Sequence, residues 1–238
     1  MATIQAWDTP PDQARAAAIR AGLGVGIAVG VSGLVFGAAA AAAGLTVAQA
    51  CALSLLAFTG ASQFALVGVV SGGGGLIAGT VGAVLLGSRN ALYGLRLASV
   101  LRVRGAKRLV TAHVVIDETA AVATSQPDRA SARTGFAVTA VALYVTWNLT
   151  TLLGAAGASR LGDPERYGLD AVGPAVFVAL LWPLLRRGRA ERLVAMAAVA
   201  VALTTTPLLP PGVPVMLAAV VAVTAVLPRP RPAGGPTS

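Results

Sequence analysis

Long runs of apolar residues without charge constrain this chain more than any other feature. The run Val47–Val70 contains no charged residue. As a helix rising about 1.5 Å per residue, it would exceed the hydrocarbon thickness of about 30 Å. The 238 residues are 56% hydrophobic and 11% charged, whereas soluble domains carry about 25% charged residues. The sequence therefore predicts an all-α, polytopic transmembrane helical bundle in a lipid bilayer.

About seven spans are expected, together with one short acidic segment. The apolar blocks are Ala21–Ala43, Val47–Val70, Leu76–Leu97, Phe136–Ala158, Leu169–Leu185, Leu193–Leu209 and Val213–Leu227. The first block is longer than the apolar core of a signal peptide, although its alanine run resembles a cleavage site. We expect one transmembrane domain over residues 15–227, flanked by a flexible tail over residues 1–14 and a disordered tail over residues 228–238.

The short segment Leu109–Ala123 carries Asp117 and Glu118 side by side. Two acids in an apolar segment are unlikely to face lipid, because a charge in hydrocarbon is costly. The segment is therefore predicted to be a re-entrant or interfacial helix, or a helix that lines a polar cavity.

The net charge of +9 comes from basic clusters between the apolar blocks. Clusters in short loops are typical of the cytoplasmic side of a membrane protein, and anionic lipid headgroups are their expected counter-charge. The sequence has no basic face with interleaved aromatic residues, so nucleic acid is not expected as a partner. If Leu109–Ala123 does not cross the bilayer, residues 102–108 face the cytoplasm and the N-terminus lies outside, although Arg15 and Arg20 argue against this. A reporter fusion that located residues 102–108 outside would contradict this topology.

Enzymatic and metal-dependent functions find little support. The single cysteine, Cys51, and the single histidine, His113, cannot form an intramolecular disulfide or a cluster of metal ligands. Adjacent acids such as Asp117 and Glu118 point about 100° apart on a helix, so they do not converge on one reacting atom. No nucleotide-binding or nucleophile motif is present. We expect no enzyme activity, cofactor or metal.

Polar residues interrupt the run Val47–Val70 at its centre, where Thr59, Gly60, Ser62 and Gln63 occur together. We expect the helix to break at Gly60 and Gln63 to face a central cavity. A broken helix exposes backbone N–H and C=O groups that suit an amino acid zwitterion, and an amide offers both a donor and an acceptor. We expect the apolar walls of the site to be formed by Phe58, Phe64 and Leu66.

Charged groups elsewhere in the apolar blocks extend this hypothesis. Asp117 or Glu118 could accept from an ammonium group or carry a coupling proton, and Arg89 could bind a carboxylate or pair with one of these acids. Arg89 could instead extend its charged end to the membrane surface. Another set of polar residues could serve only to hold helices together. These residues are Thr146, Asn148, Thr150 and Thr151.

Several short motifs in order resemble the AzlC family of branched-chain amino acid permeases. They are Gly60-Ala61-Ser62-Gln63-Phe64, Arg89 with Tyr93, Ile116-Asp117-Glu118-Thr119, Tyr144-Val145-Thr146-Trp147-Asn148 leading to Leu153-Gly154, and Gly168-Leu169-Asp170 leading to Phe177. The resemblance runs from about residue 20 to residue 227. It adds Trp147, Asn148 and Asp170 to the candidate binding or coupling residues. Family members often have asparagine and an aromatic residue or histidine where this chain has Gly87 and Asn90.

The resemblance implies a multi-pass carrier in the plasma (inner) membrane that exports branched-chain or similar aliphatic amino acids. It also implies a small membrane partner of the AzlD type, and a coupling ion is possible because no nucleotide site is present. The alternative is a non-transporting membrane subunit of a larger complex, which would bind no amino acid and would co-purify with that complex.

Overall fold

The computed structural model describes residues 10–161 and 188–209 continuously, with scattered positions over 175–186 and 213–221. Every regular element within these residues is an α-helix, as the sequence predicts. The chain divides into two compact units, Met1–Val176 and Phe177–Ser238. The predicted spans Leu169–Leu185 and Val213–Leu227 lie largely outside the described residues, and the tail over 228–238 lies wholly outside them.

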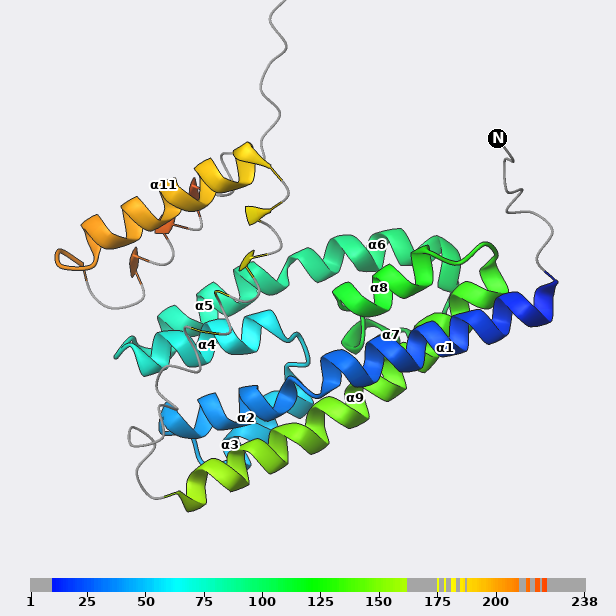
Figure 1. Cartoon of the computed structure of the whole chain (residues 1–238), viewed down its shortest axis with the longest axis horizontal. Helices are drawn as coiled ribbons and strands as arrows, with labels where there is room; N and C mark the ends of the chain where they lie inside the picture. The colour runs from blue at the N-terminus through cyan, green and yellow to red at the C-terminus, as the bar shows by residue number, and fades with distance from the viewer. Residues whose placement is uncertain are drawn as a thin grey trace, which may run out of the picture. The chain divides into compact units, whose positions relative to one another are not determined.

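The first unit is built along a pair of long helical stretches (Figure 1). α1 (Pro11–Gly30) and α2 (Gly33–Ala42) form one stretch, with a short turn between them, and α9 (Arg129–Arg160) forms the other. α1 begins inside the predicted flexible tail, because Pro11 occupies the first helical turn, where its missing N–H is not needed. Of the described helices, these two stretches alone are long and apolar enough to cross a membrane. The arrangement of seven spans therefore stays a prediction.

Glycines let the backbones of this pair touch. A Cβ on Gly37 would collide with the carbonyl oxygen of Thr151, and a Cβ on Gly154 would collide with that of Leu34. A Cβ on Gly30 would lie 2.6 Å from the Thr146 Cβ. Small residues at helix contacts permit such close approach in membrane proteins.

Shorter helices fill the space beside the pair. They are α3 (Val47–Leu56), α4 (Ala61–Ser71), α5 (Leu76–Gly87), α6 (Arg89–Leu101), α7 (Lys107–His113) and α8 (Asp117–Thr124). The expectation of one helix over Leu76–Leu97 was wrong, because Ser88 separates α5 from α6. The expectation of a single helix over Leu109–Ala123 was also wrong, because residues 114–116 are not helical and separate α7 from α8.

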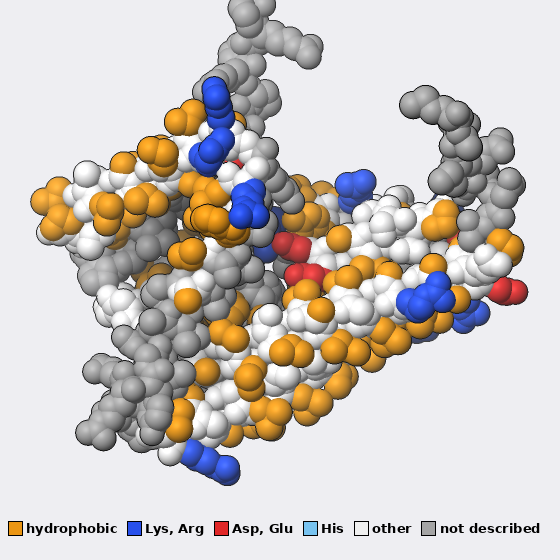
Figure 2. Space-filling model, in the orientation of Figure 1, with side chains coloured by type: hydrophobic (Ala, Val, Ile, Leu, Met, Phe, Trp, Pro, Cys, Tyr) orange, Lys and Arg blue, Asp and Glu red, His pale blue; other side chains and the backbone are white. Residues whose placement is uncertain are grey.

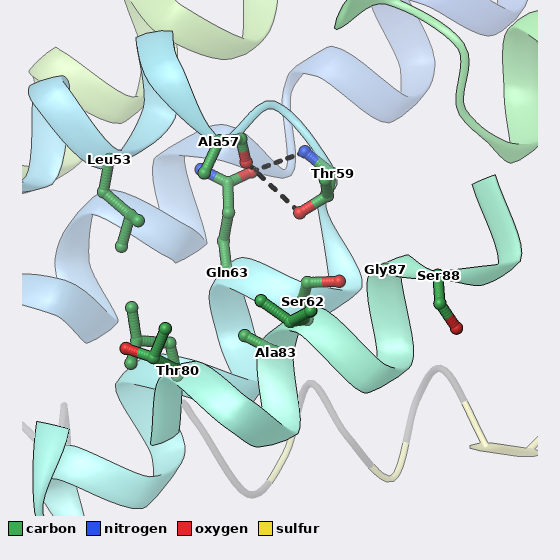
Figure 3. Close-up of a pocket in the computed structure, with 11 residues that line it drawn as sticks. Leu53, Ala57, Thr59, Ser62, Gln63, Thr80, Ala83, Gly87 and Ser88 are labelled. Carbon is green, nitrogen blue, oxygen red and sulfur yellow. Dashed lines mark hydrogen bonds between the residues drawn. The ribbon is translucent and has the colours of Figure 1, made fainter. Parts of the chain in front are cut away.

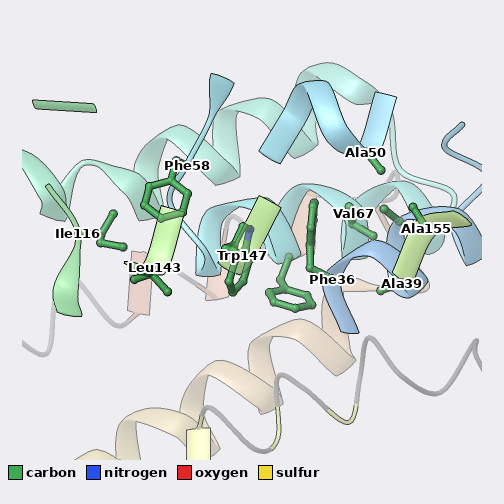
Figure 4. Close-up of a cluster of buried hydrophobic side chains, with 11 residues drawn as sticks. Phe36, Ala39, Ala50, Phe58, Val67, Ile116, Leu143, Trp147 and Ala155 are labelled. Carbon is green, nitrogen blue, oxygen red and sulfur yellow. The ribbon is translucent and has the colours of Figure 1, made fainter. Parts of the chain in front are cut away.

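Aromatic rings fill the core where α2, α3, α4 and α9 meet (Figure 4). Phe36 is fully buried, stacks on Trp147 at 6.0 Å between ring centroids and meets the edge of Phe64 at 5.4 Å. Phe58 contacts Tyr144 edge to face at 5.0 Å. Such pairs add to the stabilisation that burial alone provides.

The outer face of the long pair suits lipid. Hydrophobic side chains cover its middle in Figure 2, and basic side chains lie toward its ends. Large apolar residues such as Ile27, Val141 and Leu153 are more than half exposed. This pattern of apolar exposure between basic ends supports membrane insertion.

The second unit contains α11 (Arg189–Thr205) among its described residues. The helix overlaps the predicted Leu193–Leu209 span but begins and ends four residues earlier. Its apolar side chains Leu193, Met196 and Leu203 are exposed.

Asp128 fixes the start of α9. Its Oδ1 accepts from the backbone N–H of Ser131 at 2.9 Å and its Oδ2 from the Ser131 hydroxyl at 2.7 Å. These bonds favour the ionised carboxylate and hold the pKa of Asp128 below its ordinary value. The stabilisation is therefore complete above the unfolded pKa of about 3.9 and is lost as the pH falls through the folded pKa.

We expect the melting temperature of Asp128→Asn to depend less on pH below about 4 than that of the wild type. The amide keeps an acceptor for the Ser131 N–H but does not titrate. Thermal unfolding of both proteins in detergent between pH 7 and pH 3 measures the difference. Parallel curves over that range would contradict this role.

Candidate functional site

The helix that begins at Val47 breaks at the predicted place. α3 ends at Leu56, α4 starts at Ala61, and Gly60 between them has φ +61°. A left-handed conformation favours glycine, because other residues pay a steric cost there. The interruption at Gly60 is confirmed.

Gln63 holds the break in place from the first turn of α4. Its Oε1 accepts from the backbone N–H of Gly60 at 3.0 Å. It also accepts from that of Thr59 at 3.4 Å (Figure 3). The Thr59 hydroxyl donates back to the Ala57 carbonyl at 3.2 Å. Because Oε1 is fixed as the acceptor, the other end of the amide must be the donor Nε2.

That donor has no partner. Gln63 is 1% exposed, and its Nε2 makes no hydrogen bond among the described residues. A buried donor without an acceptor costs about 1–3 kcal/mol, so such groups often mark a place where a ligand binds.

Gln63 lines a pocket of about 530 Å³ beside the break. Leu53 and Ala57 come from α3 and its end, Leu66 from α4, and Ala83, Val84 and Gly87 from α5. The polar residues of the lining are Thr59, Ser62, Gln63, Thr80 and Ser88. The volume falls in the range of small-molecule sites, about 300–1,000 Å³.

The apolar walls differ in part from those expected. Leu66 lines the pocket, but Phe58 and Phe64 are buried in the aromatic core instead. Residues on successive helix positions point in different directions, so Phe64 turns away from the pocket when Gln63 faces it. Gly87 adds room, because a Cβ there would lie 3.1 Å from the Ser62 hydroxyl.

Two donors meet at the end of α3. The carbonyl of Leu55 lies 2.9 Å from His113 Nε2 and accepts from the Tyr144 hydroxyl at 3.2 Å. A carbonyl only accepts, so His113 Nε2 carries a proton. Sequence spacing alone does not predict this contact, because His113 and Tyr144 lie 58 and 89 positions from Leu55.

Arg89 pairs with Asp117. Arg89 Nη2 lies 3.0 Å from Asp117 Oδ2, and the two side chains are 38% and 39% exposed. Pairing with an acid is one of the three alternatives given for Arg89, and the structure shows this pairing. Arg89 follows the pocket residue Ser88 directly, so the pair joins the start of α6 to the start of α8.

Thr119 shapes the start of α8. Its fully buried hydroxyl accepts from the backbone N–H of Ile116 at 3.0 Å and donates toward the carbonyls of Val114 and Ile116. A side chain three residues into a helix that binds the N-cap N–H resembles half of a capping box. The spacing of three residues between Ile116 and Thr119 could have predicted this contact, but Thr119 was not among the predicted site residues.

We expect Arg89→Gln to lower the melting temperature by about 2–4 °C and Asp117→Asn to lower it less. The first change leaves two adjacent acids without a partner, whereas the second leaves Glu118 beside Arg89. Thermal unfolding in detergent measures both, and the exchanged pair Arg89→Asp with Asp117→Arg should recover stability. Arg96→Gln on the exposed face of α6 is the control. Equal losses without recovery would show that the pair does not matter to stability.

The other candidates lie elsewhere. Trp147 is buried in the aromatic core, where its indole N–H has no partner, and Asn148 donates to the Tyr144 carbonyl within α9. Asp170 lies outside the described residues. Thr150 donates to the Gly30 carbonyl at 2.7 Å, and Ser54 bonds Thr151 at 3.4 Å, so polar groups here join helices as expected. Within the described part of the chain, no group of metal-ligating side chains is found.

Comparison with known proteins gives one family match. Searches of curated proteins and of solved structures returned no similar chain. The family model described as AzlC protein matches residues 24–161, which include the broken helix, the pocket and the Arg89–Asp117 pair. More than half of the sequence is covered, and the chain therefore belongs to the AzlC family.

Proposed function

We propose that this protein is the large subunit of a secondary transporter that exports branched-chain or similar aliphatic amino acids. Membership of the AzlC family associates it with membrane transport of branched-chain amino acids. The proposal extends this to export, to about seven spans in the plasma membrane, and to a small partner of the AzlD type.

The observation that carries the proposal is Gln63 Nε2, which has no partner among the described residues and belongs to the wall of a pocket at a helix break. At the start of α4 the N–H groups of Gln63 and Phe64 donate to the Gly60 carbonyl at 3.0 and 3.2 Å. Those of Ala61 and Ser62 have no acceptor among the described residues, and the helix dipole there favours an anion. A substrate carboxylate would accept from these groups and from Gln63 Nε2. The hydroxyls of Ser62 and Thr80 add polar contacts.

The rest of the pocket suits an aliphatic side chain. Leu53, Leu66 and Val84 offer apolar surface, and none of the described lining residues is charged. Each buried methylene contributes about 0.8 kcal/mol to binding. A leucine, isoleucine or valine would thus place its zwitterion at the break and its side chain against α4 and α5.

The Arg89–Asp117 pair suits a gate beside the pocket. A substrate carboxylate competes for Arg89, and a proton on Asp117 weakens the ion pair. Either event would remove the ion pair between the starts of α6 and α8, so the pair could couple substrate or ion binding to movement of these helix ends.

Efflux of radiolabelled leucine from preloaded cells tests the proposal. Cells that express this chain with its AzlD-type partner should release leucine faster than cells with either protein alone. Efflux at background with both proteins in the membrane would overturn the function. Recovery of this chain in a larger complex, with no amino acid bound, would favour the non-transporting alternative.

A further inference from the structure

A second cavity of about 540 Å³ lies away from the pocket at the break. It is formed by the end of α6, the connection to α7, α7 itself and the first turns of α9. Its lining comprises Leu101, Arg102, Val103, Arg104, Lys107, Val110, Thr111, Val114, Arg133, Phe136, Ala137, Ala140 and Val141. We refer to it as the basic groove.

The charged side chains of the basic groove are all cationic. Arg102, Arg104 and Lys107 are exposed, and in the described part of the chain no acidic residue belongs to the lining. Arg133 also links α9 to the end of α6, because its guanidinium donates to the carbonyl oxygens of Val100 at 3.3 Å and of Leu101 at 2.6 Å. The groove therefore keeps its shape through Arg133 and presents three further cations to a ligand.

The walls change from charged to apolar along both helices. On α9, the lining begins at Arg133, continues one turn later with Phe136 and Ala137, and ends with Ala140 and Val141, about 12 Å from Arg133. On α7, Lys107 is followed one turn later by Val110 and Thr111. Val110 and Val141 are 71% and 65% exposed. A ligand with one anionic end and a long apolar part matches this gradient.

The backbone at Arg102 points to a function for its side chain. Among the described residues, Arg102 is the only one other than glycine with positive φ, at +50°. Glycine is the usual residue at such a helix end, and another residue pays a cost of about 1 kcal/mol or more. A strained residue is a reason to look for a role beyond stability.

We propose that the basic groove binds one anionic phospholipid such as phosphatidylglycerol. The phosphate lies among Arg102, Arg104 and Lys107, and an acyl chain follows Val110, Phe136 and Val141. A free phosphate would leave the apolar walls uncovered, and a neutral lipid would leave the cations without a counter-charge. The predicted cytoplasmic location of residues 102–108 fits, because anionic lipids enrich that leaflet. This inference goes beyond the transport proposal and does not depend on it.

Native mass spectrometry of the full chain in detergent, titrated with phosphatidylglycerol, tests the proposal. We expect one phosphatidylglycerol to bind, and the double change Arg104→Gln with Lys107→Gln to weaken binding about 30-fold. The matched control is Arg96→Gln with Arg108→Gln, which removes the same charge from two cations outside the lining. Phosphatidylcholine and inorganic phosphate are the probes for a neutral lipid and for an anion without acyl chains.

The outcomes separate the alternatives. Loss of affinity in the groove variant alone, with weak binding of phosphatidylcholine and no displacement by inorganic phosphate, supports the site. Equal losses in both double variants would indicate attraction by the whole basic cluster and would overturn it. Binding of phosphatidylcholine as tight as that of phosphatidylglycerol, or full displacement by inorganic phosphate, would also overturn it.

Arg102→Gly distinguishes a ligand role from a structural one. Glycine relieves the left-handed conformation, so the melting temperature should stay or rise. Affinity for phosphatidylglycerol should fall about fivefold through the loss of one cation, and Arg102→Lys should retain it. A variant that gains stability without losing lipid affinity would remove Arg102 from the site.

Discussion

Leucine efflux is expected to fall to background when Gln63 is replaced by alanine. The change removes the donor that faces the pocket and the acceptor that holds the N–H groups of Thr59 and Gly60. Loss of that acceptor costs stability as well, by about 1–3 kcal/mol. Efflux and thermal unfolding must therefore be measured on the same preparations.

Gln63→Glu separates binding from folding. The carboxylate keeps an oxygen for the Thr59 and Gly60 N–H groups but replaces the donor with an acceptor, which repels a substrate carboxylate. Because Gln63 is 1% exposed, burial of the carboxylate lowers the melting temperature, so efflux is compared per folded protein. On that scale we expect at least about a tenfold loss of efflux, the loss associated with about 1.4 kcal/mol.

Gln49 supplies the matched control. It also caps a helix start, since its Oε1 accepts from the Thr46 N–H at 2.9 Å, but it is exposed and does not belong to the pocket lining. Gln49→Ala should lower stability without lowering efflux per folded protein. Full efflux in Gln63→Glu, or equal loss in Gln49→Ala, would remove Gln63 from the binding site.

Gly37→Val is expected to destabilise the protein more than any other single change considered above. A Cβ at this position collides with the Thr151 carbonyl oxygen and lies 2.7 Å from the Ala155 nitrogen. Both neighbours are backbone atoms, so no rotamer change relieves the contact. Overpacking of this kind costs about 1–3 kcal/mol or more, which corresponds to a fall in melting temperature of at least about 2–4 °C.

Gly24→Val is the control on the same helical stretch. Nothing lies within 4 Å of a Cβ at Gly24, and the residue is exposed. Both substitutions replace a helical glycine with the same side chain, so their difference reports the α2–α9 contact. Similar melting temperatures for the two variants in detergent would show that the backbones are not in close contact.

The sequence predicted the helix break because the chemistry of Gly60 and Gln63 is local. Glycine permits the left-handed turn, and a glutamine three residues later reaches back to the same N–H groups. Polar residues inside an apolar run indicate a break, a polar cavity or a contact between helices rather than a face turned to lipid. For Arg89 the sequence left pairing with an acid and extension to the membrane surface open, and it did not choose between Asp117 and Glu118.

What the sequence did not predict depends on contacts between distant segments. The orientation of Phe58 and Phe64 toward the core follows from how α4 packs on α2 and α9. The breaks at Ser88 and at residues 114–116 carry no proline, and a glycine flanks only the first of them. They interrupt apolar blocks that hydropathy alone describes as continuous.

The length of α9 relates this fold to membrane thickness. From Arg133 to Arg160 the helix rises about 40 Å, close to the 40–45 Å between the outer limits of the two headgroup layers. An upright α9 therefore suits both terminal arginines, and a thinner bilayer requires the helix to tilt. Because the glycine contacts hold α1 and α2 against α9, the two stretches must tilt together. Hydrophobic mismatch would then change the inclination of the whole pair rather than of one helix.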